Sequence, residues 1–341
     1  MRKSGRYLKQ LLLKMKIIIP LALLLIFSCV GNKKTLEISP IMLEIDGPMK
    51  DSDEEISGMD WYYDNLILLP ENLNGYAFAI KKTEIDSRIN KIDTTAIKPQ
   101  KIKFSTPDYK KTVPGFDSFE SIAFRGYEVY VTIEIKFDDS MSCLLARGHI
   151  DEKSLEITIP EQTLTTLAVP SYVDNMSFES LVINRDRIIA IFEANGDSLV
   201  EKPHALSINL SGSDIEKNTI SSINYRIADA TKADGKNRFW AINYFFPGDK
   251  KTLKPGIDVL TANYGSGSTH SLSQRVERLV EFKIVNDKIM LTDSPPIEIK
   301  LEGKKTSRKW EAVARYENKG FLLATDKYPK PYTLFAYLPF N

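Results

Sequence analysis

The sequence predicts an all-β fold, a β-propeller of five four-stranded antiparallel blades. Two observations predict it: a pattern of fifteen or sixteen residues that occurs five times, and short β-rich runs without long helical periodicity. In each copy two apolar runs flank a polar turn, which is typical of a β-hairpin. The copies span residues 57–71, 120–134, 179–193, 229–243 and 311–326. Six blades are the alternative, because the chain after the fourth copy is longer than the chain between the other copies.

Two further β-rich runs follow each of the first four hairpins and complete four expected blades. They span residues 76–81 and 101–104, 144–148 and 155–159, 205–209 and 220–225, and 279–284 and 297–301. Only 334–338 follows the fifth hairpin, so we expect 36–45 near the N-terminus to supply the missing strand and close the ring. Residues 247–274, rich in Gly, Ser and Lys, are interpreted as an inserted loop, with 265–270 as a flexible tip.

The first residues have the composition of a bacterial lipoprotein signal peptide. Basic residues precede the apolar run 17–27, which is too short to span a bilayer comfortably and leads into Ser28-Cys29. We therefore predict a signal peptide over 1–28, starting at Met1 or Met15, and a lipid on Cys29 that attaches the protein to a membrane. An ordinary secretory signal and an uncleaved anchor are the alternatives.

On this interpretation a polar tether, 29–35, leads to a single propeller domain, 36–341, on the periplasmic face or the surface of the bacterial cell envelope. A lipid on Cys29 leaves Cys143 without a disulfide partner, and the apolar run around Cys143 predicts a buried core thiol. The formal net charge of +1 gives no electrostatic support for nucleic-acid binding. The sequence makes no prediction of oligomeric state.

The repeat also gathers acidic residues. Each hairpin brings the first and last residues of its copy together at the end opposite the turn. In a propeller these ends meet at one mouth of the central channel, so the sequence predicts a ring of ten side chains there. The ring comprises Ser57, Glu71, Glu120, Glu134, Glu179, Glu193, Asp229, Asn243, Glu311 and Asp326.

The eight carboxylates of this ring are candidate metal ligands. They suit Ca²⁺, which takes about six to eight oxygen ligands, whereas no His or Cys cluster indicates zinc. Four flanking cations are candidate substrate-binding residues that could hold a phosphate or carboxylate: Arg226, Arg308, Lys309 and Lys327. The alternative is purely structural, with each acid bound to backbone N–H groups or neutralised by these cations.

The blade openings FESI, FESL and WEAV, at residues 119–122, 178–181 and 310–313, resemble the E-G-[IL]-A openings of the phytase-like propeller family, often called esterase-like phytase. Residues 229–243 and 310–328 resemble its middle and final blades. The chain departs from the family by Ser or Ala where Gly is preferred, and by Ser57 in place of the first acid. The resemblance covers most of the mature chain and implies calcium-assisted hydrolysis of a phosphoester or ester.

The sequence leads to three hypotheses of function. The first is a metal-assisted hydrolase of a small phosphate ester, with Glu120, Glu179 and Glu311 as candidate catalytic residues. The second is a non-catalytic binding or scaffold propeller on the cell envelope, since one fold hosts many functions. Glycan binding ranks third, because no aromatic residue recurs at one repeat position. Nucleophile-elbow, zinc-protease and phosphate-loop motifs are absent, and the three histidines lie far apart in the chain: His149, His204 and His270.

Overall fold

The structure is a computed structural model that describes residues 34–72, 74–303 and 308–340. Residues 35–341 form one compact unit, separate from the segment 1–34. The expected signal peptide, the lipidation site Cys29 and most of the tether lie outside the described residues. Within the described ranges, no helix is both long and apolar enough to cross a membrane.

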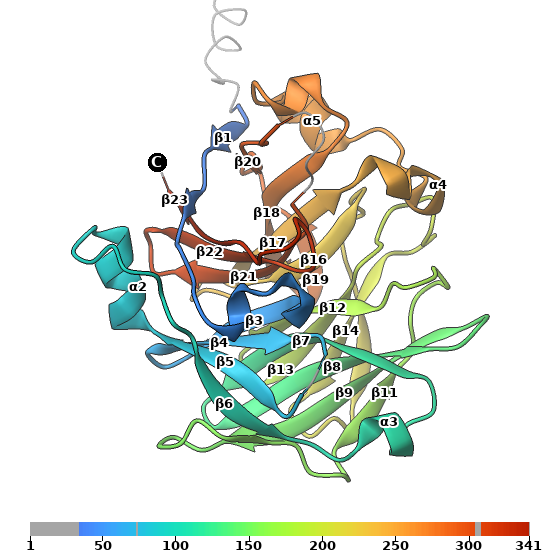
Figure 1. Cartoon of the computed structure of the whole chain (residues 1–341). Coiled ribbons are helices and arrows are strands. Elements are labelled where there is room, and N and C mark those ends of the chain that lie inside the picture. Colours follow the sequence, from blue (N-terminus) through green and yellow to red (C-terminus); the bar gives the residue numbers. More distant parts are fainter. Residues whose placement is uncertain (1–33, 73, 304–307, 341) are drawn as a thin grey trace, which may run out of the picture. The chain divides into compact units, whose positions relative to one another are not determined.

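Five blades follow one another along the described chain, and the first two are joined into one nine-stranded sheet by parallel pairing of their outer strands (Figure 1). The first comprises β3 (Ile56–Tyr62), β4 (Asn65–Pro70), β5 (Tyr76–Lys81) and β6 (Gln100–Ser105); the second β7 (Phe116–Arg125), β8 (Glu128–Lys136), β9 (Met141–Ile150), β10 (Ile157–Thr158) and β11 (Leu164–Leu167). The third comprises β12 (Phe178–Asn184), β13 (Arg187–Phe192), β14 (His204–Asn209) and β15 (Ile215–Thr219). The fourth comprises β16 (Arg226–Ala230), β17 (Arg238–Phe245), β18 (Val276–Val285), β19 (Lys288–Leu291) and β20 (Ile297–Ile299). The fifth comprises β21 (Trp310–Tyr316), β22 (Gly320–Thr325), β23 (Phe335–Pro339) and β2 (Ile41–Met42).

The innermost strands contact one another in a cycle. β3 contacts β7, β7 contacts β12, β12 contacts β16, β16 contacts β21, and β21 contacts β3. β2 pairs with β23 and supplies the fourth strand of the fifth blade, as predicted. β1 (Leu36–Ile38), just before it, pairs in parallel with β20 of the fourth blade. The structure therefore confirms an all-β propeller of five blades.

The hydrophobic core is divided among five clusters of buried side chains, each between two neighbouring blades. β-branched and aromatic residues dominate these inner faces, because they fit a pleated surface that is covered on both sides. Cys143 is a buried free thiol in the cluster between the second and third blades, as predicted. Burial raises the pKa of this thiol to about 12, which keeps it unreactive.

Two sequence predictions of local structure are wrong. The fourth strand of the third blade is β15, not 220–225, because residues 215–219 pair with β14 while Ile220 makes only an isolated bridge to Ile289. Ile220 and Ile223 are apolar because they are buried between the third and fourth blades. The insertion also carries short helices rather than a plain loop: η3 (Pro247–Asp249), α4 (Lys250–Leu253), α5 (Val259–Tyr264) and η4 (His270–Leu272).

The remaining elements lie outside the blades or between their strands. η1 (Pro48–Lys50) and η2 (Ser52–Glu54) lead into β3. α2 (Lys82–Ile89) connects β5 to β6, and α3 (Tyr109–Thr112) leads into β7.

Buried carboxylates connect the inner strands of different blades. Asp60 accepts hydrogen bonds from Phe124 N at 2.8 Å and from Lys232 Nζ at 3.0 Å. Asp229 accepts one from Val313 N at 2.7 Å. Because these carboxylates satisfy N–H groups that face the axis, they join blades and hold the inner strands in place.

Candidate functional site: an acidic pocket at one mouth of the propeller

In four repeat copies, the first residue of the copy lies at a β-bulge. The pairing of the first two strands shifts register at Ser57, Glu120, Glu179 and Glu311 in the first, second, third and fifth blades. In the fourth blade the irregularity lies between Ile227 and Ala230 and includes Asp229. A bulge leaves one residue without a partner and redirects its side chain. The recurring acid of the repeat is therefore the bulged residue of each inner strand.

The last residue of each copy lies near or just after the end of the second strand, beside the bulge of the same blade. Carboxylates of the repeat meet in two groups, and within each group the ligand oxygens lie within 4.8 Å of one another. One, here called the Glu71 group, comprises Glu55, Glu71 and Asp326. The other, the Glu120 group, comprises Glu120, Glu134 and Glu179. The sequence thus predicted the gathering of these acids, except Glu55.

The Glu71 group joins the first and fifth blades. Glu71 N donates to Glu55 O at 2.7 Å, which continues the strand pairing beyond β4. Burial and the nearby charge of Glu120 raise the pKa of Glu71 to about 10. Burial alone would raise the pKa of Glu55, but hydrogen bonds from Glu71 and Lys327 lower it. Glu71 is therefore the protonated partner and Glu55 the ionised one.

The Glu120 group lies deeper between the blades. Burial raises the pKa of Glu120, and burial together with the charge of Glu120 raises the pKa of Glu134 to about 9. Burial and the charge of Glu120 also raise the pKa of Glu179 well above its ordinary value. Glu120 accepts a hydrogen bond from Ser118 Oγ. Burial and the closeness of the three carboxyls disfavour the ionised form, so they cannot all be charged at once.

Three cations contact acids of the Glu71 group and acids beside the two groups. Arg226 binds Glu193 at 2.6 Å, and Lys309 binds both Glu311 and Asp326 at 2.8 Å. Lys327 binds Glu55. Eight carboxyls therefore face three cations: Glu55, Glu71, Glu120, Glu134, Glu179, Glu193, Glu311 and Asp326. Cations alone do not balance this site.

Two oxygens of the site lack a hydrogen-bond partner among the described residues. They are Glu193 Oε2 and Asp326 Oδ1, and both side chains are 2% exposed. A buried oxygen without a partner is costly, and such atoms call for a specific explanation. A bound cation or a ligand donor supplies one.

A cavity of about 700 Å³ opens above the Glu71 group. Glu55, Glu71 and Asp326 line it, together with residues of the fourth blade such as Arg226 and Tyr244. Its other lining residues are Asn175, Phe246, Asp249, Lys309, Lys327, Tyr328, Pro329 and Lys330. This volume suits a small molecule, and the charged groups converge on it from several blades.

The structure places several predicted site residues elsewhere. The candidate catalytic residues Glu120, Glu179 and Glu311 do not line this cavity. Asp229 is bound to backbone N–H groups. Arg308 is 1% exposed, binds Glu277 at 2.9 Å and does not line the cavity.

The two uncharged ring positions are occupied by structural contacts. Ser57 donates to Phe119 O at 2.7 Å. Asn243 accepts from Arg278 Nε at 2.8 Å and donates to Arg226 O.

Glu55 is the residue that sequence reasoning missed. The first repeat copy has Ser57 where the others have an acid, and Glu55 supplies that carboxylate from two residues upstream. Its backbone has a φ of 50°, in the left-handed region, which turns the chain into β3. The absence of an acid at Ser57, together with the acidic residues just before it, was the sequence signal that could have indicated Glu55.

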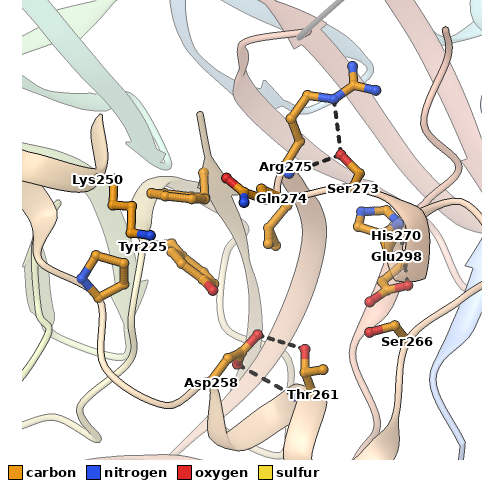
Figure 2. Close-up of a pocket in the computed structure, with 13 residues that line it drawn as sticks. Tyr225, Lys250, Asp258, Thr261, Ser266, His270, Ser273, Gln274, Arg275 and Glu298 are labelled. Atoms are coloured by element: carbon orange, nitrogen blue, oxygen red, sulfur yellow. Dashed lines mark hydrogen bonds and ion pairs between the residues drawn. The ribbon is translucent and has the colours of Figure 1, made fainter. Parts of the chain in front are cut away.

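A second pocket, of about 350 Å³, lies between the insertion and the fourth blade (Figure 2). Tyr225 and Lys250 lie on one side, and His270 and Glu298 on the other. Asp258, at its base, accepts hydrogen bonds from Thr261 and makes an ion pair with Arg278 at 2.8 Å. The charge of Asp258 is therefore already paired within the protein.

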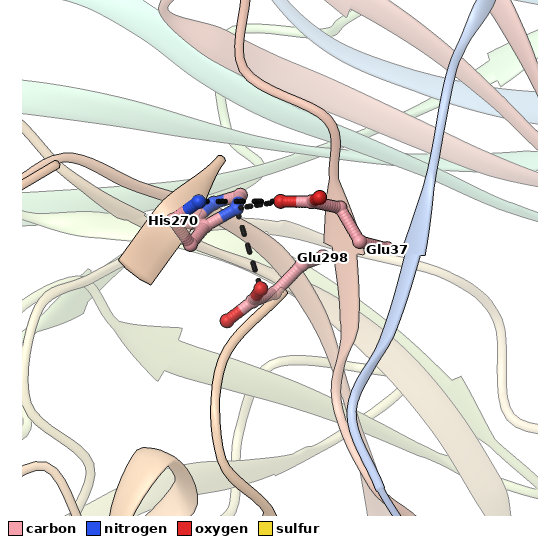
Figure 3. Close-up of side chains that lie close together, drawn as sticks. All are labelled: Glu37, His270 and Glu298. Atoms are coloured by element: carbon pink, nitrogen blue, oxygen red, sulfur yellow. Dashed lines mark hydrogen bonds and ion pairs between the residues drawn. The ribbon is translucent and has the colours of Figure 1, made fainter. Parts of the chain in front are cut away.

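His270 lies beside Glu37 and Glu298 in a third carboxylate-rich cluster (Figure 3). Its Nε2 accepts a hydrogen bond from Glu277 N at 3.2 Å, so Nδ1 carries the ring proton and donates to Glu37 at 3.0 Å. With its proton, Nδ1 has no free lone pair for a metal. Glu37 also accepts bonds from Ser268 and Thr269, so the expected flexible tip is instead held by hydrogen bonds.

Comparisons with known proteins find structural similarity at low sequence identity. No protein-family model matches the chain, and no curated protein matches its sequence. Solved structures similar to it include an α-L-arabinanase of Cellvibrio cellulosa, at 10% identity and a TM-score of 0.48, over 86% of this chain and 93% of that one. An aldose sugar dehydrogenase of Escherichia coli matches at 12% identity and a TM-score of 0.44, over 89% and 100%. At such low similarity these matches carry no conclusion about the reaction.

The fold and the site together define a β-propeller with a pocket lined by charged residues from several blades. The resemblance to the phytase-like family remains a prediction from the sequence.

Proposed function

We propose that this protein is an envelope-anchored hydrolase of phosphate esters or carboxylic esters, assisted by a divalent cation at the Glu71 group. One observation carries the proposal: Asp326, buried and with Oδ1 unpartnered, meets Glu55 and Glu71 at the wall of a cavity of about 700 Å³. The likeness of the blade openings to the phytase-like family supports the same chemistry.

The donor set of the Glu71 group fits Ca²⁺. It offers carboxylate oxygens alone, which calcium prefers. Oxygens at about 2.3–2.6 Å from one Ca²⁺ can lie no more than about 5 Å apart. The ligand oxygens of the group lie within 4.8 Å of one another, so they meet this condition. When bound, the ion would neutralise these carboxylates and polarise an ester oxygen.

The residues of the chain have separate tasks in this proposal. Glu55, Glu71 and Asp326 hold the cation. Lys327 and Lys330 line the same cavity and bind the anionic head of the ester. Lys309, bound to Glu311 and Asp326, fixes the orientation of Asp326. Hydrolysis forms a bond from water oxygen to phosphorus or carbonyl carbon, breaks the ester bond and protonates the leaving oxygen.

The test is the turnover of an aryl phosphate and an aryl ester by the full chain, with calcium and with a chelator. We expect turnover that requires calcium and falls at least about 100-fold in Glu71→Gln. The exposed Glu152, outside the cavity, provides the matched control Glu152→Gln, which should keep full activity. Absence of metal-dependent turnover on both substrates would refute the proposal.

A binding or scaffold role is the second candidate, and a feature of the insertion favours it. Ile257 is 83% exposed and Leu272 is 89% exposed, so the insertion presents apolar side chains to solvent. Exposed apolar side chains of this kind are suited to a partner surface. Replacing Glu120, Glu179 and Glu311 together separates the two roles. If the variant folds but loses catalysis, the purely non-catalytic role is excluded.

We also propose that a lipid on Cys29 holds the protein at the membrane of the cell envelope. The apolar run followed by Ser28-Cys29 supports this, and these residues lie outside the described part of the chain. Cys29→Ser should abolish incorporation of labelled fatty acid. Unchanged labelling in that variant would contradict the anchor.

A further inference from the structure

Aromatic side chains form part of the wall of the cavity of about 700 Å³. Phe246 is 44% exposed and Tyr328 is 52% exposed, and both line the cavity with Tyr244 and Pro329. Aromatic surface left in water at a concave site is available to a ligand that covers it. The cavity thus offers carboxylates, cations and flat apolar surface in one wall.

The ring of Phe246 lies beside Gly248. A Cβ on Gly248 would lie 2.4 Å from Cε1 of Phe246, so the ring occupies the space that a side chain at 248 would fill. Part of the ring therefore lies close to Gly248 while the residue remains 44% exposed overall. A pre-positioned ring loses little conformational entropy when a ligand packs on it.

The cations of the pocket limit how much negative charge it accepts. Arg226 and Lys309 each already contact two carboxylates. Lys327 and Lys330 are 39% and 46% exposed, and each contacts one carboxylate, so they retain donors for one anionic group. Because Arg226 and Lys309 are already committed to carboxylates, a further anionic group on the ligand would find no uncommitted cation among these four residues.

We infer that the substrate has a single anionic head and an aromatic or similarly flat apolar group that packs on Phe246 and Tyr328. A polyphosphorylated ring such as inositol hexakisphosphate is disfavoured. This inference rests on the proposed function, since it assigns the substrate class of the same site. It narrows the expectation that follows from the phytase-like resemblance.

The test compares phenyl phosphate, methyl phosphate and inositol hexakisphosphate, all with calcium and the full chain. Calorimetry measures affinity, and kcat/KM is measured for the same three. We expect phenyl phosphate to bind about tenfold more tightly than methyl phosphate, as aromatic packing of this size would give. Phe246→Ala and Gly248→Ala should reduce this ratio to about twofold or less. Gly248→Ala displaces only the far end of a flexible side chain, so it tests the ring position without removing it.

The control is Tyr172→Ala, because Tyr172 is 49% exposed and lies outside this cavity. It should keep the wild-type ratio. Equal affinity for phenyl and methyl phosphate, or preference for the hexakisphosphate, overturns the inference and leaves the hydrolase proposal standing. If no phosphate ester binds or turns over with calcium, both fail.

Discussion

Substitution of Asp326 by Asn tests the cation site most directly. Two carboxylate charges within 4.8 Å of each other repel each other by at least about 3.5 kcal/mol at an effective dielectric constant of about 20. A bound dication reverses this repulsion for each ligand, so loss of one charge weakens binding by a comparable energy. We therefore expect Asp326→Asn to raise the dissociation constant for calcium about 100-fold, which is about 2.7 kcal/mol.

The assay is thermal unfolding of the chelated protein with and without added calcium. At calcium about 100 times the wild-type dissociation constant, binding stabilises the wild type by about 2.7 kcal/mol and the variant by about 0.4 kcal/mol. For a domain of this size the wild-type Tm should rise by roughly 5 °C and that of the variant by roughly 1 °C.

Asp249→Asn is the matched control. Asp249 lines the same cavity and pairs with Arg226 at 3.1 Å, but it belongs to neither carboxylate group. It should retain the full calcium shift. An equal shift in Asp326→Asn and wild type, or no shift in the wild type, would refute the reasoning.

Three further predictions concern individual carboxyls. The pKa of Glu71 is raised to about 10, so the folded, metal-free protein holds a proton that the unfolded chain releases near pH 4.5. The contribution of Glu71 to stability is therefore complete below pH 4.5 and falls as the pH rises toward 10, by at most about 1.4 kcal/mol per pH unit. Glu71→Gln should flatten this slope in urea unfolding. The pKa of Glu37 is lowered to about 2 because hydrogen bonds from Thr269 and His270 outweigh the effect of burial, so its contribution is complete above pH 4.5 and is lost toward pH 2. We expect about 1–2 kcal/mol there, below the full shift because solvent screens the group, and Glu37→Gln should remove this acid-dependent loss in pH-dependent unfolding. Asp229→Ala leaves buried N–H groups of two blades unpaired and should lower the urea-unfolding free energy by about 2–4 kcal/mol; a loss below about 1 kcal/mol would contradict the joining role of Asp229.

The five-blade fold could be read from the chain because the repeat is local. Each copy carries its own turn and alternating apolar runs, so hairpins such as 120–134 and 311–326 fold with neighbours in sequence. The strand after the third hairpin was misplaced because apolar residues at Ile220 and Ile223 serve the contact between blades. Hydrophobic periodicity indicates that residues are buried. It does not indicate whether they belong to a strand of the blade or to a contact between blades.

The gathering of acids was also predictable, but their division into roles was not. Hairpin geometry alone brings Glu120 close to Glu134. By contrast, Asp229 and Glu311 are both the first residues of their copies, yet Asp229 binds backbone N–H groups and Glu311 pairs with Lys309. The distinction depends on where the bulge of each blade falls, and the shift at Asp229 differs from the others.

The sequence by itself determined the class of fold and the strand ends at which carboxylates collect, and it favoured five blades over six, because these features follow from contacts within a repeat. Only the tertiary structure decided that Glu55 joins Glu71 and Asp326, that Arg308 is paired with Glu277, and that Phe246 and Tyr328 line the pocket. These relations join residues of different blades or loops, and chain spacing does not encode distances between segments so far apart.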